Sequence, residues 1–303
     1  MRKAVIDVGS NSVLLLVGEK TDLGWKPILE DTAVTALGEG TKQTGVLGEQ
    51  GMSRTLEALH DFFEKAKRAG AGQVRAVATM AARIATNAEG FQKRAEEQST
   101  PIEILSGEDE AQLGFEAVAN DPTFKDCRRL SIVDPGGHST ELVTADREDA
   151  HWNVRFRRSY PVGTLALRGD LLQDASPNPL LLLKACQEID DEIGLCYRPH
   201  EHGTVVTLGA TGTNLVSIRD RLTTWQPELV HGARLDYEEV SKAVGWLSTL
   251  TDEQRAAVPG MESGRQKTIH LGALILERFL FALRAPECYV SVKGWRHALL
   301  ERS

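Results

Sequence analysis

The sequence predicts an α/β protein built from two domains, and three observations lead to this prediction. The chain has 303 residues, whereas a single hydrophobic core usually stops growing at about 250–300 residues. Short apolar runs alternate along the chain with longer segments whose apolar residues recur at helical spacing. A segment near the N-terminus also recurs without gaps further along the chain, which indicates an internal repeat. We therefore expect one repeat in each of two domains, at residues 1–125 and 126–303.

The first half of the chain is expected to begin with two strands, Ala4–Asp7 and Val13–Gly18, joined by a turn of small polar residues. A helix ending at Gly70 should follow, because glycine commonly ends helices. Its apolar face would consist of Met52, Leu56, Leu59, Phe63 and Ala66. Asn87 and Ser106 are residue types that cap helix N-termini. The remaining strands expected here are Val74–Ala78 and Ile102–Leu105, and the remaining helices are Thr79–Ala85, Ala88–Glu97 and Glu108–Ala119.

The second half repeats this alternation, starting with Leu130–Asp134, an apolar run that again ends in an acid. Residues 176–179 hold two prolines around an asparagine and are interpreted as a helix start, where proline is favoured. Asp236 is expected to cap another helix. Further strands are expected at Leu142–Ala145, Val154–Tyr160, Val205–Leu208 and Cys288–Ser291, and helices at Leu180–Leu195, Tyr237–Leu250 and Thr268–Leu283.

Composition and charge exclude several classes of protein. A net charge of −8 and a pI near 5.6 argue against a general nucleic-acid-binding protein, which would need a basic surface. The longest apolar stretch, Leu271–Ala285, contains Glu277 and Arg278 and is unsuited to spanning a bilayer. Because no signal peptide is visible, we expect a cytoplasmic protein with no membrane partner. The four cysteines form no CxxC pair and are expected to be reduced thiols: Cys127, Cys186, Cys196 and Cys288.

The internal repeat is the strongest indication of function. When Asp7 is placed on Asp134, residues 4–12 lie over residues 131–139, and each copy consists of a strand, an acid, a Gly/Ser turn and a second strand. Glycine lets backbone N–H groups approach a phosphate closely, and a carboxylate at a strand end can hold Mg²⁺. Two such loops would hold one phosphate chain from both sides, although two ordinary hairpins with Asx-type turns give the same pattern. We expect phosphate contacts from Gly9, Ser10, Asn11, Ser12, Gly136, Gly137, His138, Ser139 and Thr140.

Two further segments could complete a phosphate site. Gly209 and Thr211 lie in a turn before a predicted helix, whose free N–H groups attract anions, although a plain strand–helix connection has the same pattern. Glu141 shares a strand face with Ser139, whereas the first repeat has Leu14 in the place of this acid. An acid in a slot where the duplicate has leucine departs from pure packing, so we interpret Glu141 as functional.

Several other side chains allow both a functional and a structural interpretation. Arg83 either reaches phosphate from a helix start or forms a surface ion pair. Glu110 lies in the first turn of a predicted helix, where an acid ordinarily just complements the helix dipole. His138 either donates to phosphate or fills a turn position. A basic cluster further on either follows a long polyanion or is the solvated side of a strand: Arg155, Arg157 and Arg158.

Short motifs in a fixed order make the chain similar to a known family. They are residues 7–12, 78–83, 105–111, 134–141, 161–163, 208–211, 230–232 and 291–296. Together they resemble the exopolyphosphatase / guanosine pentaphosphate phosphohydrolase family along nearly the whole chain. The resemblance implies the actin-like ATPase superfamily fold, an α/β fold of two ribonuclease-H-like domains with an interdomain cleft. It also implies the short, two-domain form of the family.

The resemblance implies a phosphoanhydride hydrolase, an exopolyphosphatase that releases terminal orthophosphate from inorganic polyphosphate with Mg²⁺, or with Mn²⁺. By position, Glu110 corresponds to the family's catalytic base and Glu141 to its second catalytic glutamate. The glycine-rich turns correspond to its phosphate-binding loops, and Asp7, Asp134 and Glu141 are the expected metal ligands. The expected partners are polyphosphate, (p)ppGpp as a substrate or inhibitor, and a second copy of the chain in a homodimer.

The sequence departs from the family pattern at positions beside these motifs. The family usually has Ser at Met80, Gly at His138 and Ala210, and an acid near Val292. Two alternatives therefore stay open, namely a pppGpp 5′-phosphohydrolase with the same machinery and a (p)ppGpp- or polyphosphate-binding sensor with little catalysis. Because both expected catalytic glutamates are present, an active enzyme is favoured.

Overall fold

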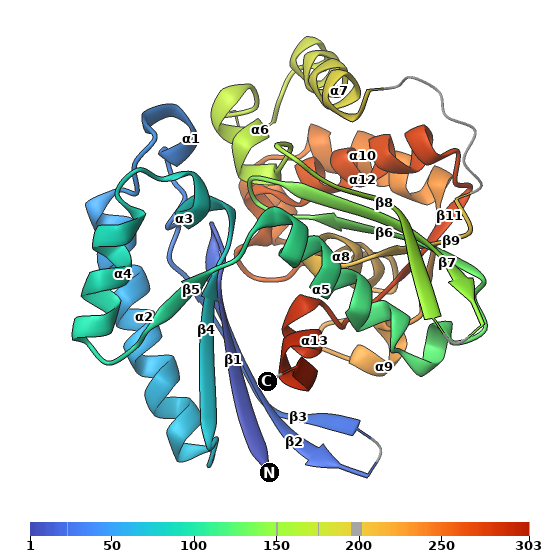
Figure 1. Cartoon of the computed structure of the whole chain (residues 1–303). Helices are drawn as coiled ribbons and strands as arrows, with labels where there is room; N and C mark the ends of the chain where they lie inside the picture. Colours follow the sequence, from blue (N-terminus) through green and yellow to red (C-terminus); the bar gives the residue numbers. More distant parts are fainter. Residues whose placement is uncertain (23, 150, 175, 195–201, 303) are drawn as a thin grey trace. The chain divides into compact units, whose positions relative to one another are not determined.

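The computed structural model describes residues 1–22, 24–149, 151–174, 176–194 and 202–302, and it divides into two compact units (Figure 1). Unit 1 is Met1–Leu113 together with Trp295–Ser303, and unit 2 is Gly114–Gly294. The sequence placed the domain boundary between residues 125 and 126, whereas the compact units divide inside helix α5 (Gly107–Ala119). A helix that runs through the division leaves no linker composition to detect in the sequence.

The sheet of unit 1 has five strands in the order β3-β2-β1-β4-β5. β1 (Arg2–Val8), β2 (Ser12–Thr21) and β3 (Gly24–Val34) form an antiparallel meander. β4 (Gln73–Ala78) and β5 (Ile102–Ile104) continue the sheet parallel to β1. The β1–β2 turn therefore lies at the same end of this sheet as the C-terminal ends of β4 and β5.

The sheet of unit 2 repeats this topology. β6 (Arg129–Pro135), β7 (Thr140–Glu148) and β8 (His151–Tyr160) form the meander. β9 (Thr204–Thr207) and β11 (Glu287–Val290) follow parallel to β6, and β10 (Arg234–Asp236) adds an antiparallel edge. Without β10, the order β8-β7-β6-β9-β11 matches that of unit 1 strand for strand. This is the ribonuclease-H-like topology in both units, so the predicted fold class is confirmed.

Helices bury an apolar stripe against each sheet. In unit 1, α2 packs on β1 and β2, and the five residues predicted for its apolar face are all buried. The helices of this unit are α1 (Thr41–Thr44), α2 (Glu49–Arg68), α3 (Met80–Ile84), α4 (Ala88–Glu97), the first part of α5, and α13 (Trp295–Arg302).

In unit 2 the core surrounds α12 (Ile269–Leu283), which is buried along most of its length. The apolar stretch Leu271–Ala285 is thus a core helix, and no helix in the described part of the chain is long and apolar enough to cross a membrane. The other helices are α6 (Thr164–Asp170), α7 (Pro179–Ile193), α8 (Gly209–Arg219), α9 (Pro227–Val230), α10 (Tyr237–Thr249) and α11 (Asp252–Ala256), with 3₁₀ turns at Pro122–Phe124 and Arg265–Lys267.

Each strand and helix expected from the sequence is present, with ends that differ by a few residues. The expected helix end at Leu195 and the thiol of Cys196 lie outside the described residues, whereas the other three cysteines are free thiols. The main omission is β3. It is an edge strand with an exposed outer row and contains Pro27, so it lacks the apolar alternation that reveals half-buried strands.

The expected helix starts are confirmed with one correction. Asn178 caps α7 by accepting from Leu181 N–H, and Asp236 forms a capping box at α10. Asn87 occupies the N-cap position of α4, but its side chain makes no capping bond. Its amide instead pairs with both backbone groups of Leu47, at 2.8 and 3.0 Å, because this distant loop offers a donor and an acceptor together.

Candidate active site

The first glycine turn, between β1 and β2, is held closed by its own backbone. Gly9 N–H donates to Ser12 O at 3.0 Å, and both Ser10 and Ser12 are buried. The chain that leaves β3 then bonds back to the turn, since Gly38 N–H donates to Ser10 O at 2.8 Å and Asn11 O accepts from Thr35 and Ala36. The turn is therefore fixed from two sides before any ligand binds.

The second glycine turn, between β6 and β7, has the same pattern of bonds. Gly136 N–H donates to Ser139 O at 2.9 Å, at the register equivalent to Gly9 and Ser12. The chain that leaves β8 again returns, and Leu165 N–H donates to Gly137 O at 2.7 Å. The duplication predicted from the sequence thus extends to single hydrogen bonds. His138, Ser139 and Thr140 are all buried in this turn.

Gly163 provides the closest contact on the second turn. A Cβ at this position would lie 2.4 Å from the carbonyl atoms of Gly137, so only glycine lets the two backbones meet. The neighbouring Val162 accepts a 2.7 Å bond from Thr140 Oγ1. The motif at residues 161–163 therefore supports the conformation of the second turn.

Replacing Gly163 with alanine is expected to lower the free energy of unfolding by about 1–3 kcal/mol, because the added methyl group overpacks this contact. Gly245→Ala is the matched control in unit 2. Gly245 lies in α10 with no atom near its missing Cβ, so alanine should stabilise the protein by about 0.5–1 kcal/mol. Urea unfolding of both variants checks the prediction, and equal stability changes would contradict it.

The third turn lies against the acid of the second. Gly209 begins α8 with φ of +73°, and a Cβ there would lie 2.9 Å from Asp134 Oδ1. Glycine is thus needed both for the backbone conformation and for the space that the carboxylate occupies. Thr211 is buried two residues further on, with its hydroxyl against Gly272 of α12, so its side chain faces the core of unit 2.

Asp134 and Glu141 are cross-strand partners on β6 and β7, and their carboxylates therefore share one face of the sheet. Glu141 is 4% exposed and accepts a 2.7 Å bond from Ser159 Oγ on β8. In unit 1 the corresponding partners are Asp7 and Leu14. The second repeat therefore has two acids where the first has an acid and a leucine. This pair lowers the stability of the fold, because like charges directly opposite each other in a sheet repel.

This acid pair suits a hard divalent cation. Mg²⁺ is usually held by one or two carboxylates, waters and the phosphates of its substrate. Among the described residues no group of three or more His, Cys, Asp or Glu side chains could hold a metal ion alone. The donor set of Asp134 and Glu141 fits a Mg²⁺ ion that needs phosphate to complete its coordination.

Asp7 is the buried acid of unit 1. Burial raises its pKa to about 7, and the nearby guanidinium of Arg296 on α13 opposes this rise. Arg296 lies in the motif at residues 291–296, where the sequence indicates no role for it. The contact could not be read from spacing, since the two residues lie at opposite ends of the chain. The three expected metal ligands are divided between the units, with Asp7 in one and the acid pair in the other.

Arg83 and Glu110 form a partly buried pair in unit 1. Arg83 Nη1 donates to Leu105 O at 2.8 Å and lies 3.4 Å from Glu110 Oε2. Met80, where the family usually has serine, places its sulfur 3.2 Å from Arg83 Nη2. The side chains of Arg83 and Glu110 are only 22% and 12% exposed. Arg83 therefore forms an ion pair, as one of the two interpretations expected, but the pair is mostly buried rather than on the surface. The ion pair helps to hold Glu110 in position.

Comparisons with known proteins agree with these motifs. A profile of the Ppx/GppA phosphatase family matches residues 16–303. The chain is 28% identical to exopolyphosphatase 2 of Mycobacterium tuberculosis over 301 residues, covering 93% of this chain and 91% of that protein. It is 30% identical to a Ppx/GppA family member of Aquifex aeolicus, with a TM-score of 0.82 and coverage of 99% and 96%. An exopolyphosphatase of Cytophaga hutchinsonii, 20% identical, shares the fold with a TM-score of 0.86 and coverage of 99% and 97%. The chain therefore belongs to the Ppx/GppA phosphatase family.

Proposed function

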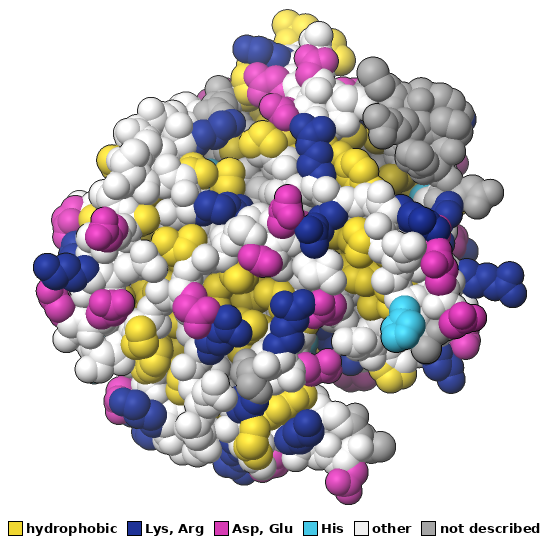
Figure 2. All heavy atoms as spheres, viewed as in Figure 1, with side chains coloured by type: hydrophobic (Ala, Val, Ile, Leu, Met, Phe, Trp, Pro, Cys, Tyr) yellow, Lys and Arg dark blue, Asp and Glu magenta, His cyan; other side chains and the backbone are white. Residues whose placement is uncertain are grey.

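We propose that this protein is an exopolyphosphatase that releases terminal orthophosphate from inorganic polyphosphate with the help of Mg²⁺. The proposal rests on the two glycine turns, which have matching hydrogen bonds. Beside the second turn two acids, Asp134 and Glu141, face each other, whereas the first turn has Asp7 opposite Leu14. The relatives named exopolyphosphatase support the choice of substrate. On the face shown in Figure 2, basic and acidic side chains are interspersed, so a polyanion has to be bound by local groups.

The proposed reaction needs an aligned water, a base and positive charge against the phosphoryl oxygens. Backbone N–H groups of the glycine turns would bind the phosphates, and Asp134 with Glu141 would hold Mg²⁺, which neutralises developing charge. Glu110, oriented by Arg83, would take a proton from the water. The water oxygen bonds to the terminal phosphorus, the bond to the bridging oxygen breaks, and the products are orthophosphate and a chain one phosphate shorter.

A second candidate is a pppGpp 5′-phosphohydrolase, which breaks the same kind of bond in a different substrate. A third is a binding sensor with little catalysis. The contact of Met80 with Arg83 is the observation that favours the third, because a thioether replaces a hydroxyl beside the residue that orients the proposed base.

Phosphate release from long polyphosphate, short polyphosphate and pppGpp tests the proposal, each with Mg²⁺ and with EDTA. We expect the fastest Mg²⁺-dependent release from polyphosphate. Glu141→Gln should lower turnover by at least about 10–100-fold, the loss that is typical when even an outer-shell partner of a metal ligand is removed. Glu148→Gln, on the same strand but 57% exposed, is the control and should keep normal turnover.

If phosphate is released faster from pppGpp than from polyphosphate, the protein is instead the second candidate, a pppGpp 5′-phosphohydrolase. A folded protein that releases no phosphate from any of the three would overturn the hydrolase. Tight binding of polyphosphate or (p)ppGpp by calorimetry would then establish the sensor.

A further inference from the structure

The basic cluster on β8 is divided between the two faces of its sheet. The register between β7 and β8 shifts where Thr144 pairs with Phe156 and Ala145 with Val154, so Arg155 is the extra residue of a bulge in β8. Arg155 turns to one face and donates to Asp146 at 2.9 Å and to Glu148 at 2.6 Å. Hydrogen bonds from Arg129, and then from Arg155, lower the pKa of Asp146 to about 2, so this network is ionic at neutral pH. Two carboxylates thus hold Arg155.

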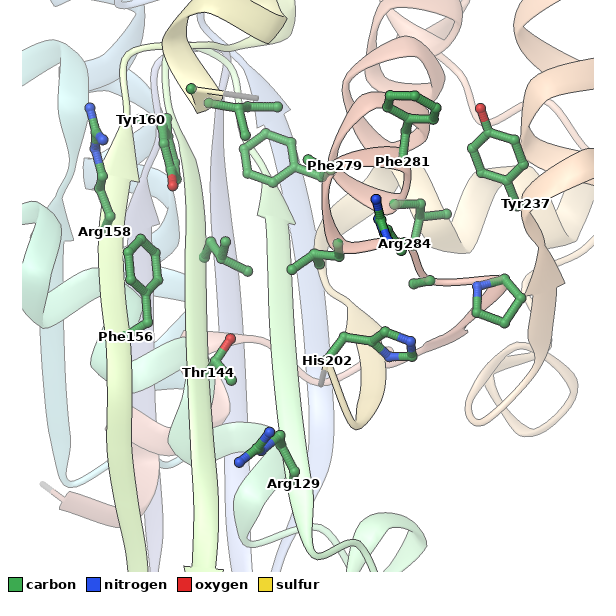
Figure 3. Close-up of a pocket in the computed structure, with 18 of the residues that line it drawn as sticks. Arg129, Thr144, Phe156, Arg158, Tyr160, His202, Tyr237, Phe279, Phe281 and Arg284 are labelled. Carbon is green, nitrogen blue, oxygen red and sulfur yellow. The ribbon is translucent and has the colours of Figure 1, made fainter. Parts of the chain in front are cut away.

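Arg158 lies on the same face as Arg155. Its guanidinium lies over the ring of Tyr160, 4.5 Å from the centroid, as in a cation–π contact. Both arginines line a groove of about 1700 Å³ between β8 and α12. Figure 3 shows Arg158 on the β8 side of this groove. This groove is on the face opposite Glu141, so neither arginine belongs to the candidate active site.

Arg157 belongs to the other face. Ser159 bonds to Glu141, and strand alternation places Arg157, two residues earlier, on the same side of the sheet. Its Cα lies roughly 7 Å from that of Ser159 along the strand, a distance that an arginine side chain can span. β8 is the edge strand of the sheet, and Arg157 is exposed there. Of the three arginines, Arg157 alone shares a face with the acid pair.

We propose that Arg157 is a positioning residue for phosphates distant from the reacting end, and that it gives the enzyme a preference for long chains. The inference rests on the proposed function. A guanidinium binds phosphate oxygens in a two-pronged, charge-assisted manner, which an overall acidic protein needs at a polyanion site. In this proposal a chain of three phosphates would be held by the glycine turns alone, whereas a longer chain would also reach Arg157 on β8.

Steady-state kinetics of Arg157→Ala tests the proposal, with Arg158→Ala as the matched control. Arg157→Ala should raise KM for long polyphosphate about tenfold, with little change in kcat and little change in KM for tripolyphosphate. The slope of log(kcat/KM) against log[salt] should become shallower by about one for the long chain. Arg157→Lys should restore the salt slope and part of the affinity, and Arg158→Ala should resemble the wild type.

Three results would overturn the proposal: no change in Arg157→Ala, equal changes for long and short chains, or the same effect in Arg158→Ala. If the wild type releases no phosphate, the proposed hydrolase activity is rejected, but the role of Arg157 in binding long chains is still open to test. Titration of fluorescent long-chain polyphosphate into both variants then decides on Arg157, since the proposal requires weaker binding in Arg157→Ala alone.

Discussion

Replacing Glu110 with glutamine is expected to lower kcat for phosphate release by about 10²–10⁴-fold, because glutamine keeps the shape of the side chain but accepts no proton. KM should change little, since the glycine turns that we propose as the phosphate-binding groups are separate from Glu110. Release of phosphate from polyphosphate under saturating Mg²⁺, followed across pH, measures the effect. A rate that depends on an ionised base in the wild type should lose that dependence in the variant.

Two controls separate catalysis from folding in this experiment. Glu108→Gln changes an exposed acid in the first turn of the same helix and should leave kcat near that of the wild type. Glu110→Gln also removes the charge beside the sheltered Arg83, so urea unfolding should be measured in parallel. Wild-type turnover in a folded Glu110→Gln protein would remove Glu110 from the mechanism.

Asp7→Asn is expected to stabilise the metal-free protein at neutral pH by up to about 4 kcal/mol. The pKa of Asp7 rises to about 7 in the folded protein, from an ordinary value of 3.8. Near pH 4 the carboxyl is largely protonated in the folded state, and the variant should match the wild type. Between pH 4 and 7 the unfolded state ionises first, so wild-type stability falls as pH rises. Above pH 7 the loss is complete and constant.

Urea unfolding in EDTA at pH 4.5, 6 and 8 measures this difference, and parallel pH profiles of the two proteins would contradict it. Added Mg²⁺ supplies a second readout. If Asp7 takes part in metal binding, Mg²⁺ should raise the melting temperature of the wild type at pH 8 more than that of Asp7→Asn. The variant should also lose phosphate release, which would show that the buried charge is kept for function at the expense of stability.

The repeat made much of the site predictable. Placing Asp7 on Asp134 identified both glycine turns, and the same register marked Glu141 as an acid in a position that packing gives to Leu14. Local patterns are informative here because the turns are contiguous in sequence. The role proposed for Glu110 rests on the resemblance, since an acid in a first helical turn has an ordinary structural reason to be there.

What the sequence could not show depends on contacts between distant segments. Three contacts form only in the tertiary fold. They are the packing of Gly163 on Gly137, the charge of Arg296 near Asp7, and the hydrogen bonds between the Asn87 amide and the Leu47 backbone. The division of the basic cluster on β8 needs the bulge, which shifts the alternation by one residue and has no sequence signal of its own.

Because helix α13 lies at the C-terminal end of the chain but belongs to unit 1, unit 1 can be completed only after all of unit 2 has been synthesised. In unit 1, Leu300 of α13 packs against Gly18 so closely that a Cβ there would lie 2.9 Å from Leu300 Cδ1. All of Gly114–Gly294 is synthesised between the first strands and this helix, which takes roughly 10–40 s at about 5–20 residues per second. On the ribosome, the first domain therefore stays incomplete until the second has emerged, and a nascent chain released early would expose the surface that α13 covers.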